Sequence, residues 1–465
     1  MTDGGGRFEA RLGLVDAVAL VAGSMIGSGI FIVSADVARR LPAPGWLLVV
    51  WGLAGVVTVA GAISHGGLAA AMPRMGGQYV YLTELWGPLW GFLFGWTLVL
   101  VIQSGSIAAV SVAFATFAGT LWPALSNATT LLSIGPVVVT PVTVVAIAVI
   151  LTLTALNSRG VEAGRRVQTS LTVVKVGTLL GVIALGLLLG GGVGRAANLA
   201  APTFATGMPL ATALPRLGPA MVGALFSSTA WATVTFAAAE VRDPVRTIPR
   251  ALALGTALVC TLYVATNVAY LNVLPLTGAA DGADALARGI QHATADRVGT
   301  AVMGVLAGGS SGAALMAVAV MISTFGCVNG LVLAGARVAW AMAHEGRLPR
   351  PLARLNPRRV PGVALWLQGL WASLLALSGR YGDLLDYVVI AELLFYLLTV
   401  ASLFILTRRT GSPPRGIAYP YLQLAYLAAV TVLVIDLLVT KPTYTWGSLT
   451  VVATGLPVYF LLTSR

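Results

Sequence analysis

The chain has 465 residues, of which 57% are hydrophobic and only 9% are charged, a composition that excludes a soluble globular domain. The formal net charge of +12 does not indicate a nucleic-acid partner, because the basic residues are dispersed and form no dense tract. We therefore expect an all-α integral membrane protein.

Apolar runs recur along the whole chain, and twelve of them are candidate membrane-spanning helices, since about 20 residues cross a bilayer core. In chain order the candidates cover residues 12–38, 46–71, 89–121, 141–156, 167–189, 215–240, 251–274, 302–343, 361–377, 384–406, 422–439 and 449–462. The fourth and ninth candidates are short.

The basic residues predict the orientation of these spans. With the N-terminus inside, 18 of the 28 Lys and Arg residues fall in cytoplasmic segments and 8 fall outside. The remaining two, Lys175 and Arg337, lie within spans. This asymmetry follows the positive-inside rule. We therefore expect an even number of spans, with both termini in the cytoplasm.

The cysteine and histidine residues indicate no metal site and no catalytic site. Cys260 and Cys327 are the only cysteines and lie in different apolar spans, so we expect no disulfide framework. The three histidines are scattered, and no Cys and His cluster has the spacing of metal ligands. No nucleophile and base motif is visible. The sequence therefore predicts neither an enzyme nor a cofactor.

The first span contains the stretch GSMIGSGIF, residues 23–31, which places poor helix formers in the middle of an apolar run. A phosphate-binding glycine loop is excluded because no strand precedes it. Gly23 and Gly27 have the spacing of closely packed helices, but close packing leaves the two serines unexplained. We favour a discontinuous helix, whose unwound backbone at the membrane midplane exposes N–H and C=O groups to a ligand.

The sixth span contains a second candidate break, five spans after the first, as expected for an inverted repeat. Its centre, Ser227, Ser228 and Thr229, is a hydroxyl cluster between Phe226 and Trp231. Taken alone, this pattern favours a continuous helix in which each hydroxyl bonds to the carbonyl one turn earlier. Only its correspondence with the first span indicates a break.

Five motifs, in order along the chain, resemble those of amino acid permeases of the amino acid–polyamine–organocation superfamily, nearest to prokaryotic relatives of the L-type amino acid transporters. They are GSMIGSGIF in the first span, MPRMGGQYVYL after the second, VQTSLTVVKVGTLL in the fifth, EVRDPVRTIPRA closing the sixth, and ISTFGCVNGLVLAGARVAWAMAHEGRLP in the eighth. The resemblance implies a LeuT-type fold in a single transmembrane domain, residues 1–465. Spans one to five (12–192) and six to ten (215–408) would be inverted repeats, followed by two peripheral spans (418–463).

The resemblance also implies a site for a free amino acid between the unwound parts of the first and sixth spans. Backbone N–H groups of the first span would bind the carboxylate, at Ile26, Gly27, Ser28 and Gly29. Carbonyl groups of the sixth span would accept hydrogen bonds from the amino group, near Phe226, Ser227 and Thr229. Phe226 would also be an aromatic gate above the substrate. The side-chain pocket would be shaped by Ser228, Ala230 and Ala232.

Lys175 is an intramembrane lysine, which is costly and therefore indicates a function. Snorkelling suits it poorly, because about eight apolar residues lie on either side of it in the span. In the resembling family this position is where sodium-coupled members hold a cation, and its neighbours here would be Gly23 or Ile26, and Ser323. A buried amine is compatible with a fixed positive charge and with a titrating group in proton coupling, and the sequence does not separate the two.

Two acidic residues and two departures from the family pattern complete the expected site. Glu240, at the cytoplasmic end of the sixth span, would act structurally or in an inner gate. Structural pairing or a helix-end position is expected for most of the charges in spans, a group that includes Glu392. Many relatives carry an acidic residue in the second span where this chain has Gly67. The second outside loop, 122–140, lacks the cysteine that links animal L-type transporters to a heavy chain, so we expect no disulfide-linked partner.

We therefore expect a secondary active transporter of L-amino acids that works by alternating access, by exchange or by proton-coupled symport. Neutral substrates are favoured because the expected pocket carries no carboxylate. A cationic amino acid or polyamine transporter is the alternative and would need Glu240 or Glu392 to reach the cavity. An amino-acid-binding membrane sensor is an alternative of another class. The expected partners are the substrate and membrane lipid, without nucleic acid. The excess of arginine over lysine and the abundance of alanine and glycine fit a bacterial source, so the expected location is a bacterial cytoplasmic membrane.

Overall fold

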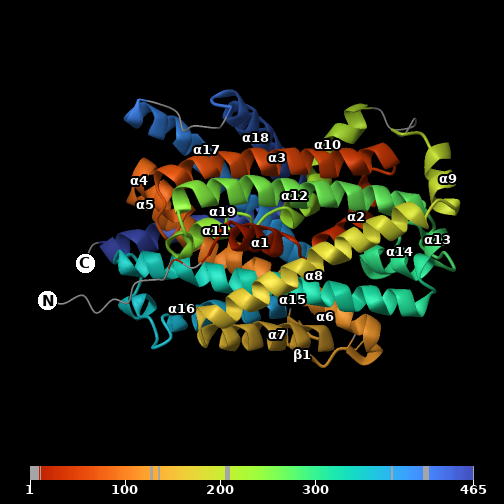
Figure 1. Ribbon diagram of the computed structural model, residues 1–465, viewed down its shortest axis with the longest axis horizontal. Helices are drawn as coiled ribbons and strands as arrows, with labels where there is room; N and C mark the ends of the chain where they lie inside the picture. The colour runs from red at the N-terminus through yellow and green to blue at the C-terminus, as the bar shows by residue number, and fades with distance from the viewer. Residues whose placement is uncertain are drawn as a thin grey trace.

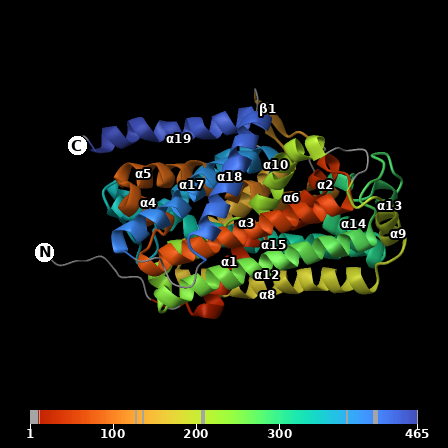
Figure 2. The same cartoon turned by 90° about the horizontal axis from the view of Figure 1, so that it is seen from above.

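The computed structural model describes residues 10, 12–125, 129–134, 137–204, 210–378, 381–411 and 418–463. Helices dominate these residues, and the long ones run roughly along one common axis (Figure 1). Turned by 90°, the bundle has α19 along one side and α8 along the opposite side (Figure 2). The strands β1 (Leu132–Ile134) and β2 (Val137–Val139) form a small antiparallel sheet.

Nine helices of the described segments are long and apolar enough to cross a membrane. Eight of them are single elements: α3 (Pro44–Ala71), α7 (Pro141–Ser158), α8 (Val161–Leu188), α12 (Pro244–Val273), α15 (Ser310–His344), α17 (Tyr381–Thr410), α18 (Tyr421–Thr440) and α19 (Pro442–Thr463). The ninth joins α5 (Pro88–Thr97), the π-helical turn η1 (Leu98–Ile102) and α6 (Gln103–Leu121). The prediction of an all-α membrane protein is confirmed.

The remaining apolar helices are interrupted or short. A bent pair, α1 (Leu14–Met25) and α2 (Gly29–Arg40), is a tenth span when it is counted as one broken helix. The sixth predicted span contains α10 (Leu210–Ser227), α11 (Thr233–Phe236) and η3 (Ala238–Glu240). The ninth is α16 (Gly362–Ser378), which is apolar but shorter than the others.

Short helices connect the long ones. They are α4 (Gln78–Trp86), η2 (Pro123–Leu125), α9 (Val193–Ala200), α13 (Ala285–Arg288), η4 (Thr294–Asp296), α14 (Val298–Leu306) and η5 (Arg350–Ala353). Some predicted boundaries differ from the structure: α8 begins at Val161 rather than 167, α19 begins at Pro442 rather than 449, and residues 302–306 belong to α14 rather than to the eighth span. Gly308 and Gly309 both have positive φ, which ends α14 before α15 begins.

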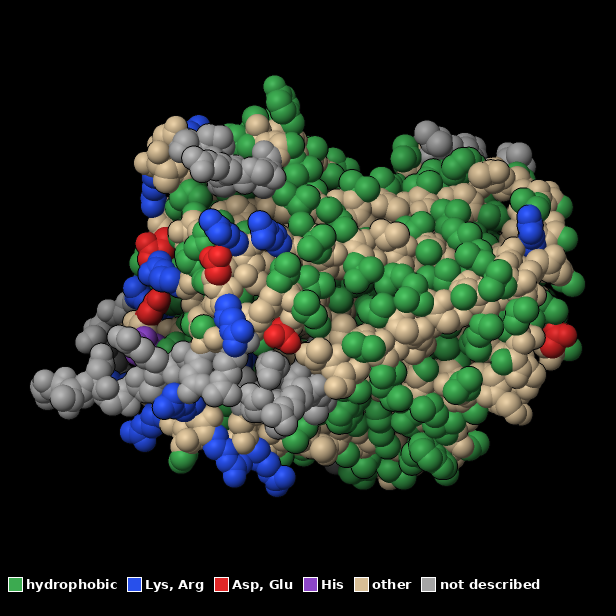
Figure 3. All heavy atoms as spheres, in the orientation of Figure 1, with side chains coloured by type: hydrophobic (Ala, Val, Ile, Leu, Met, Phe, Trp, Pro, Cys, Tyr) green, Lys and Arg blue, Asp and Glu red, His purple; other side chains and the backbone are tan. Residues whose placement is uncertain are grey.

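The outer face of the bundle is apolar over most of its length. In Figure 3, Lys and Arg side chains gather toward one end of the long axis, while hydrophobic side chains cover most of the rest of this face. Large apolar side chains are exposed on α8, α18 and α19, among them Leu180, Val432 and Phe460. Such a surface is unfavourable in water and favourable against lipid chains.

The two interrupted spans are enclosed by continuous helices. The first piece, α1, packs against α8, α12 and α15, whereas α2 packs against α10 and α14. In turn, α10 packs against α3, α17 and α18 as well as α2. Since the long helices surround the broken ones, both interruptions are shielded from lipid, as non-helical backbone at membrane depth requires.

A buried ion pair closes the end of the sixth span. The Glu240 carboxylate, in η3, lies 2.7 Å from the guanidinium of Arg337 on α15. The Arg337 guanidinium also donates to the carbonyl of Leu333. The backbone N–H of Leu12 donates to the Glu240 carbonyl over 2.9 Å, which ties the start of the first span to the same point. This end of the bundle is therefore held by the first, sixth and eighth predicted spans together.

We expect Arg337→Met to destabilise the protein, because it leaves the Glu240 carboxylate buried without its cation, which costs about 3–5 kcal/mol. The double variant Glu240→Gln, Arg337→Met removes both charges and is expected to recover most of the loss. Thermal unfolding in detergent measures the Tm of both variants and the wild type. Equal Tm values for the single and double variants would contradict a structural role for the pair.

Candidate functional site

The structure breaks the first span where the glycines predict. Helix α1 ends at Met25, α2 begins at Gly29, and the two pieces are bent by 42°. Residues 26–28 between them are not helical. Because α2 starts anew at Gly29, its first amide N–H groups lack the acceptor one turn earlier that a continuous helix would give them, although the Phe31 N–H donates to the Ser28 carbonyl over 3.0 Å. The positive end of the α2 dipole therefore lies at the break.

The sixth span is also broken, and the continuous helix favoured by its local pattern is wrong. Helix α10 ends at Ser227, and residues 228–232 are non-helical before α11 begins. Ala230 has a φ of 67°, a conformation that costs a residue other than glycine about 1–2 kcal/mol. Strain of this kind persists only where the surroundings enforce it, and it is typical of functional sites.

The two breaks are in direct contact. A Cβ atom added to Gly29 would lie 1.9 Å from the hydroxyl oxygen of Ser227, so only glycine permits this approach. The Tyr263 hydroxyl, on α12, is 2.9 Å from the Met25 carbonyl and 3.0 Å from the Ser227 carbonyl. One side chain therefore joins the last residue of α1 to the last residue of α10.

Lys175 binds the end of α1. Its ammonium, fully buried on α8, donates to the carbonyls of Gly23 over 2.5 Å and of Ile26 over 2.9 Å. Both neighbours that the sequence offers as alternatives are thus contacted. The Ser323 hydroxyl, on α15, lies 3.2 Å from the Ile26 carbonyl and 3.3 Å from that of Gly27. A cation at the negative end of a helix dipole is a favourable arrangement.

Donors from three helices satisfy the carbonyl groups that the break leaves open. Besides the bonds of Lys175, Ser323 and Tyr263, the Cys327 thiol donates to the Ser24 carbonyl over 3.0 Å. Each carbonyl from Gly23 to Gly27 therefore has a partner on α8, α12 or α15. In lipid an unsatisfied carbonyl costs several kcal/mol, so these donors are what make the broken end of α1 stable.

A cavity of about 20 Å³ lies between the two breaks. This is room for about one water molecule and is too small for a free amino acid. Its described lining comes from both breaks, α6 and α15: Ser24, Met25, Gly27, Ser28, Gly29, Ser106, Val110, Phe226, Ser227, Thr229, Ala230, Cys327 and Leu331. The structure is therefore closed around this site.

Most of the predicted substrate residues lie together at this cavity. Ile26, Ser228 and Ala232 do not line it. The Ile26 carbonyl faces Lys175, and the Ser228 hydroxyl donates to the Ala224 carbonyl over 2.8 Å. Glu240 and Glu392 do not line it either. Glu240 is paired with Arg337 as described above, and Glu392 accepts a hydrogen bond of 2.5 Å from the Tyr396 hydroxyl.

The sequence does not single out Tyr263 or the α6 residues Ser106 and Val110. Each sits in a continuous apolar helix without a glycine break or an intramembrane charge to mark it. Among the described residues, no three His, Cys, Asp or Glu side chains are grouped so that they could hold a metal ion.

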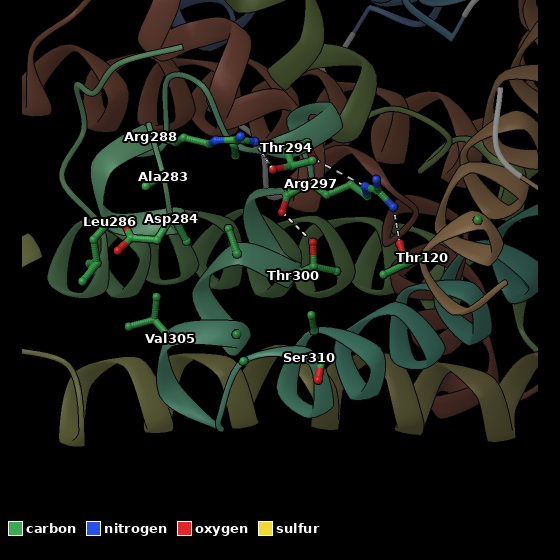
Figure 4. Close-up of a pocket in the computed structure, with 17 residues that line it drawn as sticks. Thr120, Ala283, Asp284, Leu286, Arg288, Thr294, Arg297, Thr300, Val305 and Ser310 are labelled. Atoms are coloured by element: carbon green, nitrogen blue, oxygen red, sulfur yellow. Dashed lines mark hydrogen bonds between the residues drawn. The ribbon is translucent and has the colours of Figure 1, made fainter. Parts of the chain in front are cut away.

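A larger cavity, of about 840 Å³, lies elsewhere, between the end of α6, the α13–α14 region and the start of α15 (Figure 4). Arg288 donates to the Thr294 hydroxyl over 2.7 Å, and Arg297 donates to the Thr120 hydroxyl. Burial lowers the pKa of Arg297. Figure 4 shows both arginines on one side of the cavity, with Val305 across from them. Its described lining includes no residue of either break, so it is separate from the small cavity.

The sequence profile of the amino acid permease family matches residues 12–460. Asc-type amino acid transporter 1 of Mus musculus is 30% identical over 455 residues, which cover 97% of this chain and 81% of the relative. Large neutral amino acids transporter small subunit 2 of Homo sapiens is 30% identical over 471 residues, covering 98% and 81%. Serine/threonine exchanger SteT of Bacillus subtilis (strain 168) is 26% identical over 463 residues, covering 98% of each chain.

These relatives are transporters rather than enzymes, and the matches extend over nearly the whole chain. The chain therefore belongs to the amino acid permease family of the amino acid–polyamine–organocation superfamily, close to its L-type transporters.

Proposed function

We propose that the protein is a secondary active transporter of neutral L-amino acids that works by alternating access. Amino acid transport as such follows from the family and its relatives. The observation that carries the finer proposal is the contact of two broken helices around one small, closed cavity. Non-helical backbone from two helices, meeting inside a bundle, supplies donors and acceptors to a zwitterion without any charged side chain.

In this proposal the substrate carboxylate binds the N–H groups at the start of α2, at Gly27, Ser28 and Gly29. The amino group binds carbonyls at the end of α10. The Ser227 carbonyl already lies near Tyr263, and the Phe226 carbonyl accepts from Thr229 over 2.8 Å. The Phe226 carbonyl also accepts from the Thr229 backbone N–H over 3.1 Å, so both of its lone pairs are used. The Ser227 carbonyl has a second lone pair, which can accept a further hydrogen bond from a substrate ammonium.

The preference for neutral substrates rests on the lining of the cavity. The side chains described there are small, hydroxylic or apolar, such as Ser106, Ala230 and Leu331, and none is charged. A cationic amino acid or a polyamine would need a carboxylate, and neither Glu240 nor Glu392 lines the cavity. The names of the relatives, serine/threonine exchanger and large neutral amino acids transporter, support the same substrate class.

We further propose twelve spans with both termini in the cytoplasm. The nine long helices, the bent pair of α1 and α2, the broken span of α10 and α11, and the short α16 add to twelve. Their order is consistent with a LeuT-type arrangement of two inverted repeats, 12–192 and 215–408, followed by α18 and α19.

The proposed location is a bacterial cytoplasmic membrane. Both cysteines are buried and free, which supports function without a disulfide-linked partner.

Uptake into proteoliposomes tests the proposal. Labelled serine and leucine are supplied outside, with or without internal amino acid and with or without an inward proton gradient, and unlabelled arginine and putrescine are added as competitors. Uptake that needs internal amino acid indicates exchange, whereas uptake driven by the gradient alone indicates symport. Inhibition of uptake by arginine or putrescine, but not by unlabelled neutral amino acids, would contradict the preference for neutral substrates and indicate a cationic substrate. Binding without flux would favour the sensor.

We expect Lys175→Ala to lower the transport rate by more than about tenfold while the protein stays folded. The variant removes two charge-assisted hydrogen bonds to the end of α1, each worth about 1.5–3 kcal/mol. Uptake measures the rate, and size-exclusion elution of the detergent-solubilised protein measures folding. Lys441→Ala removes the only other lysine, which pairs with Asp386 away from the breaks, and is the control. Normal flux and normal pH dependence in Lys175→Ala would exclude a coupling role.

We expect Gly27→Leu to abolish measurable substrate binding. A Cβ at Gly27 already lies 3.3 Å from the Cys327 sulfur, so the rest of a leucine side chain would fill the cavity. Gly177→Leu, on α8, is the matched control because nothing lies within 4 Å of a Cβ there. Binding of labelled serine to the purified proteins compares the two variants. Unchanged affinity in Gly27→Leu would exclude a substrate site at this break.

We expect Tyr263→Phe to weaken substrate binding by about tenfold, because the Met25 and Ser227 carbonyls lose the donor that joins them. Tyr270→Phe is the matched control on the same helix: the Tyr270 hydroxyl is buried and has no partner within the part of the chain that the structure describes. Equilibrium binding of labelled substrate compares the variants. Equal losses in both would show that ring packing, rather than the hydroxyl contact, is responsible.

A further inference from the structure

The buried carboxyl group of Glu392 lies next to the break of the sixth span and has no positively charged partner among the described residues. Glu392, on α17, is only 8% exposed. Its Oε1 accepts the 2.5 Å hydrogen bond from Tyr396, while its Oε2 is buried and has no hydrogen-bond partner among the described residues. Within those residues, no Lys or Arg forms an ion pair with it. The transport mechanism proposed above does not use this group.

The groups around Glu392 come from four elements. Thr229, in the broken part of the sixth span, lies beside the carboxyl group, and Tyr426 of α18 also faces it. Tyr396, on the same helix as Glu392, stacks on Trp231 of the break with ring centroids 4.9 Å apart. His65 of α3 packs edge-on against Trp231, at 4.6 Å. The titratable neighbours are thus one histidine and two tyrosines.

His65 is not placed to neutralise a carboxylate. Its Nδ1 lies 3.1 Å from the Gly61 carbonyl, so this nitrogen carries a proton and donates to it. Its Nε2 is buried without a partner among the residues described, which favours the uncharged ring. No cation therefore faces the carboxyl group from α3, from α18 or from the break.

An unpaired carboxylate in this position would cost several kcal/mol, whereas a neutral carboxylic acid removes most of that cost. The closed structure is therefore compatible with a protonated Glu392. Thr229 lines the substrate cavity, and Trp231 belongs to the same non-helical stretch, 228–232. Any movement of this stretch that admits a substrate also alters the surroundings of Glu392.

We propose that Glu392 is a proton-binding site coupled to the amino acid site. In the closed state the carboxyl group is protonated. When the stretch 228–232 moves and water reaches it, the O–H bond breaks, the electron pair stays on the carboxylate oxygen, and the proton passes to water. Closure reverses the step. This inference rests on the proposed transport function: the proton is the coupled ion, and Glu392 is the residue through which pH affects transport.

The division of roles with Lys175 follows from the contacts. Lys175 donates to two carbonyls, a setting that suits a permanent ammonium group. One carboxyl oxygen of Glu392 has no hydrogen-bond partner, and no positive charge pairs with it among the described residues. This setting suits a group that gains and loses a proton. Lys175 thus acts as the fixed charge, and Glu392 acts as the titrating group.

Transport measured against pH tests the coupling. Wild-type protein and Glu392→Gln are reconstituted, and exchange of labelled serine is followed from acid to alkaline pH. We expect the wild-type rate to fall as the pH rises, because an ionised Glu392 opposes closure. Glu392→Gln keeps the shape of the neutral acid, so we expect it to exchange serine at a rate that does not change with pH. A pH profile equal to that of the wild type would overturn the proposal.

Asp436→Asn is the matched control. Asp436, on α18, also has a carboxylate oxygen that is buried without a described partner, but it lies against Gly218 of α10, away from the break. We expect this variant to keep the wild-type pH profile. A loss of pH dependence in Asp436→Asn equal to that in Glu392→Gln would mean that any buried carboxyl group in the bundle has this effect, and would overturn the assignment to Glu392.

Infrared spectroscopy tests the proton site without transport. The difference spectrum between wild type and Glu392→Gln, in lipid at neutral pH, is expected to contain the carbonyl stretch of a protonated carboxylic acid. Absence of that band, with both proteins folded, would overturn the proposal. If the band is present but the wild type moves no amino acid under any condition, the proton site holds and the proposed transport function fails.

Discussion

The carbonyl groups at the end of α1 are the constraint on which the site depends. A helix interrupted inside a membrane leaves these groups without partners, and lipid supplies none. Lys175, Cys327, Ser323 and Tyr263 supply donors from three neighbouring helices. The N–H groups at the start of α2 then lie at the cavity rather than against the carbonyls of a continuous helix. The protein satisfies the carbonyl half of the broken backbone, and we propose that the N–H half binds the substrate.

The second constraint is the distance between the breaks. Gly29 and Ser227 approach so closely that a single added methyl group would collide, and Tyr263 spans the same contact. This approach produces the small cavity, and it also explains why the cavity is lined by backbone and short side chains. Acidic side chains are placed further out: Glu240 pairs with Arg337, and Glu392 lies on the far side of Thr229 from the cavity. The result is a neutral cavity inside a framework that contains charges.

Some of these features are predictable from sequence and others are not, for physical reasons. Span positions follow from apolar runs, and the break of the first span follows from glycines that a continuous helix disfavours. The break after Ser227 has no such mark, because its hydroxyl groups also fit an intact helix, and it is enforced by tertiary contacts such as the Gly29 approach. Lys175 stands out as a charge in an apolar run, whereas Tyr263 is an ordinary residue of an apolar helix. Its importance comes only from the two carbonyls that it meets.

The packing of the two halves of the first span has a mechanical consequence. Helix α1 is bound to α8, α12 and α15, whereas α2 packs with α10 and α14. The two halves therefore have largely different neighbours, with α12 in contact with both, and the non-helical residues 26–28 connect them. The hydroxyl group of Tyr263 has a single proton for two acceptors, so one of its two contacts can be released while the other keeps a full hydrogen bond. In the proposed alternating-access mechanism, such a connection would let the two groups of helices separate while Tyr263 keeps one hydrogen bond, which is the movement that a gate on one side of a membrane requires.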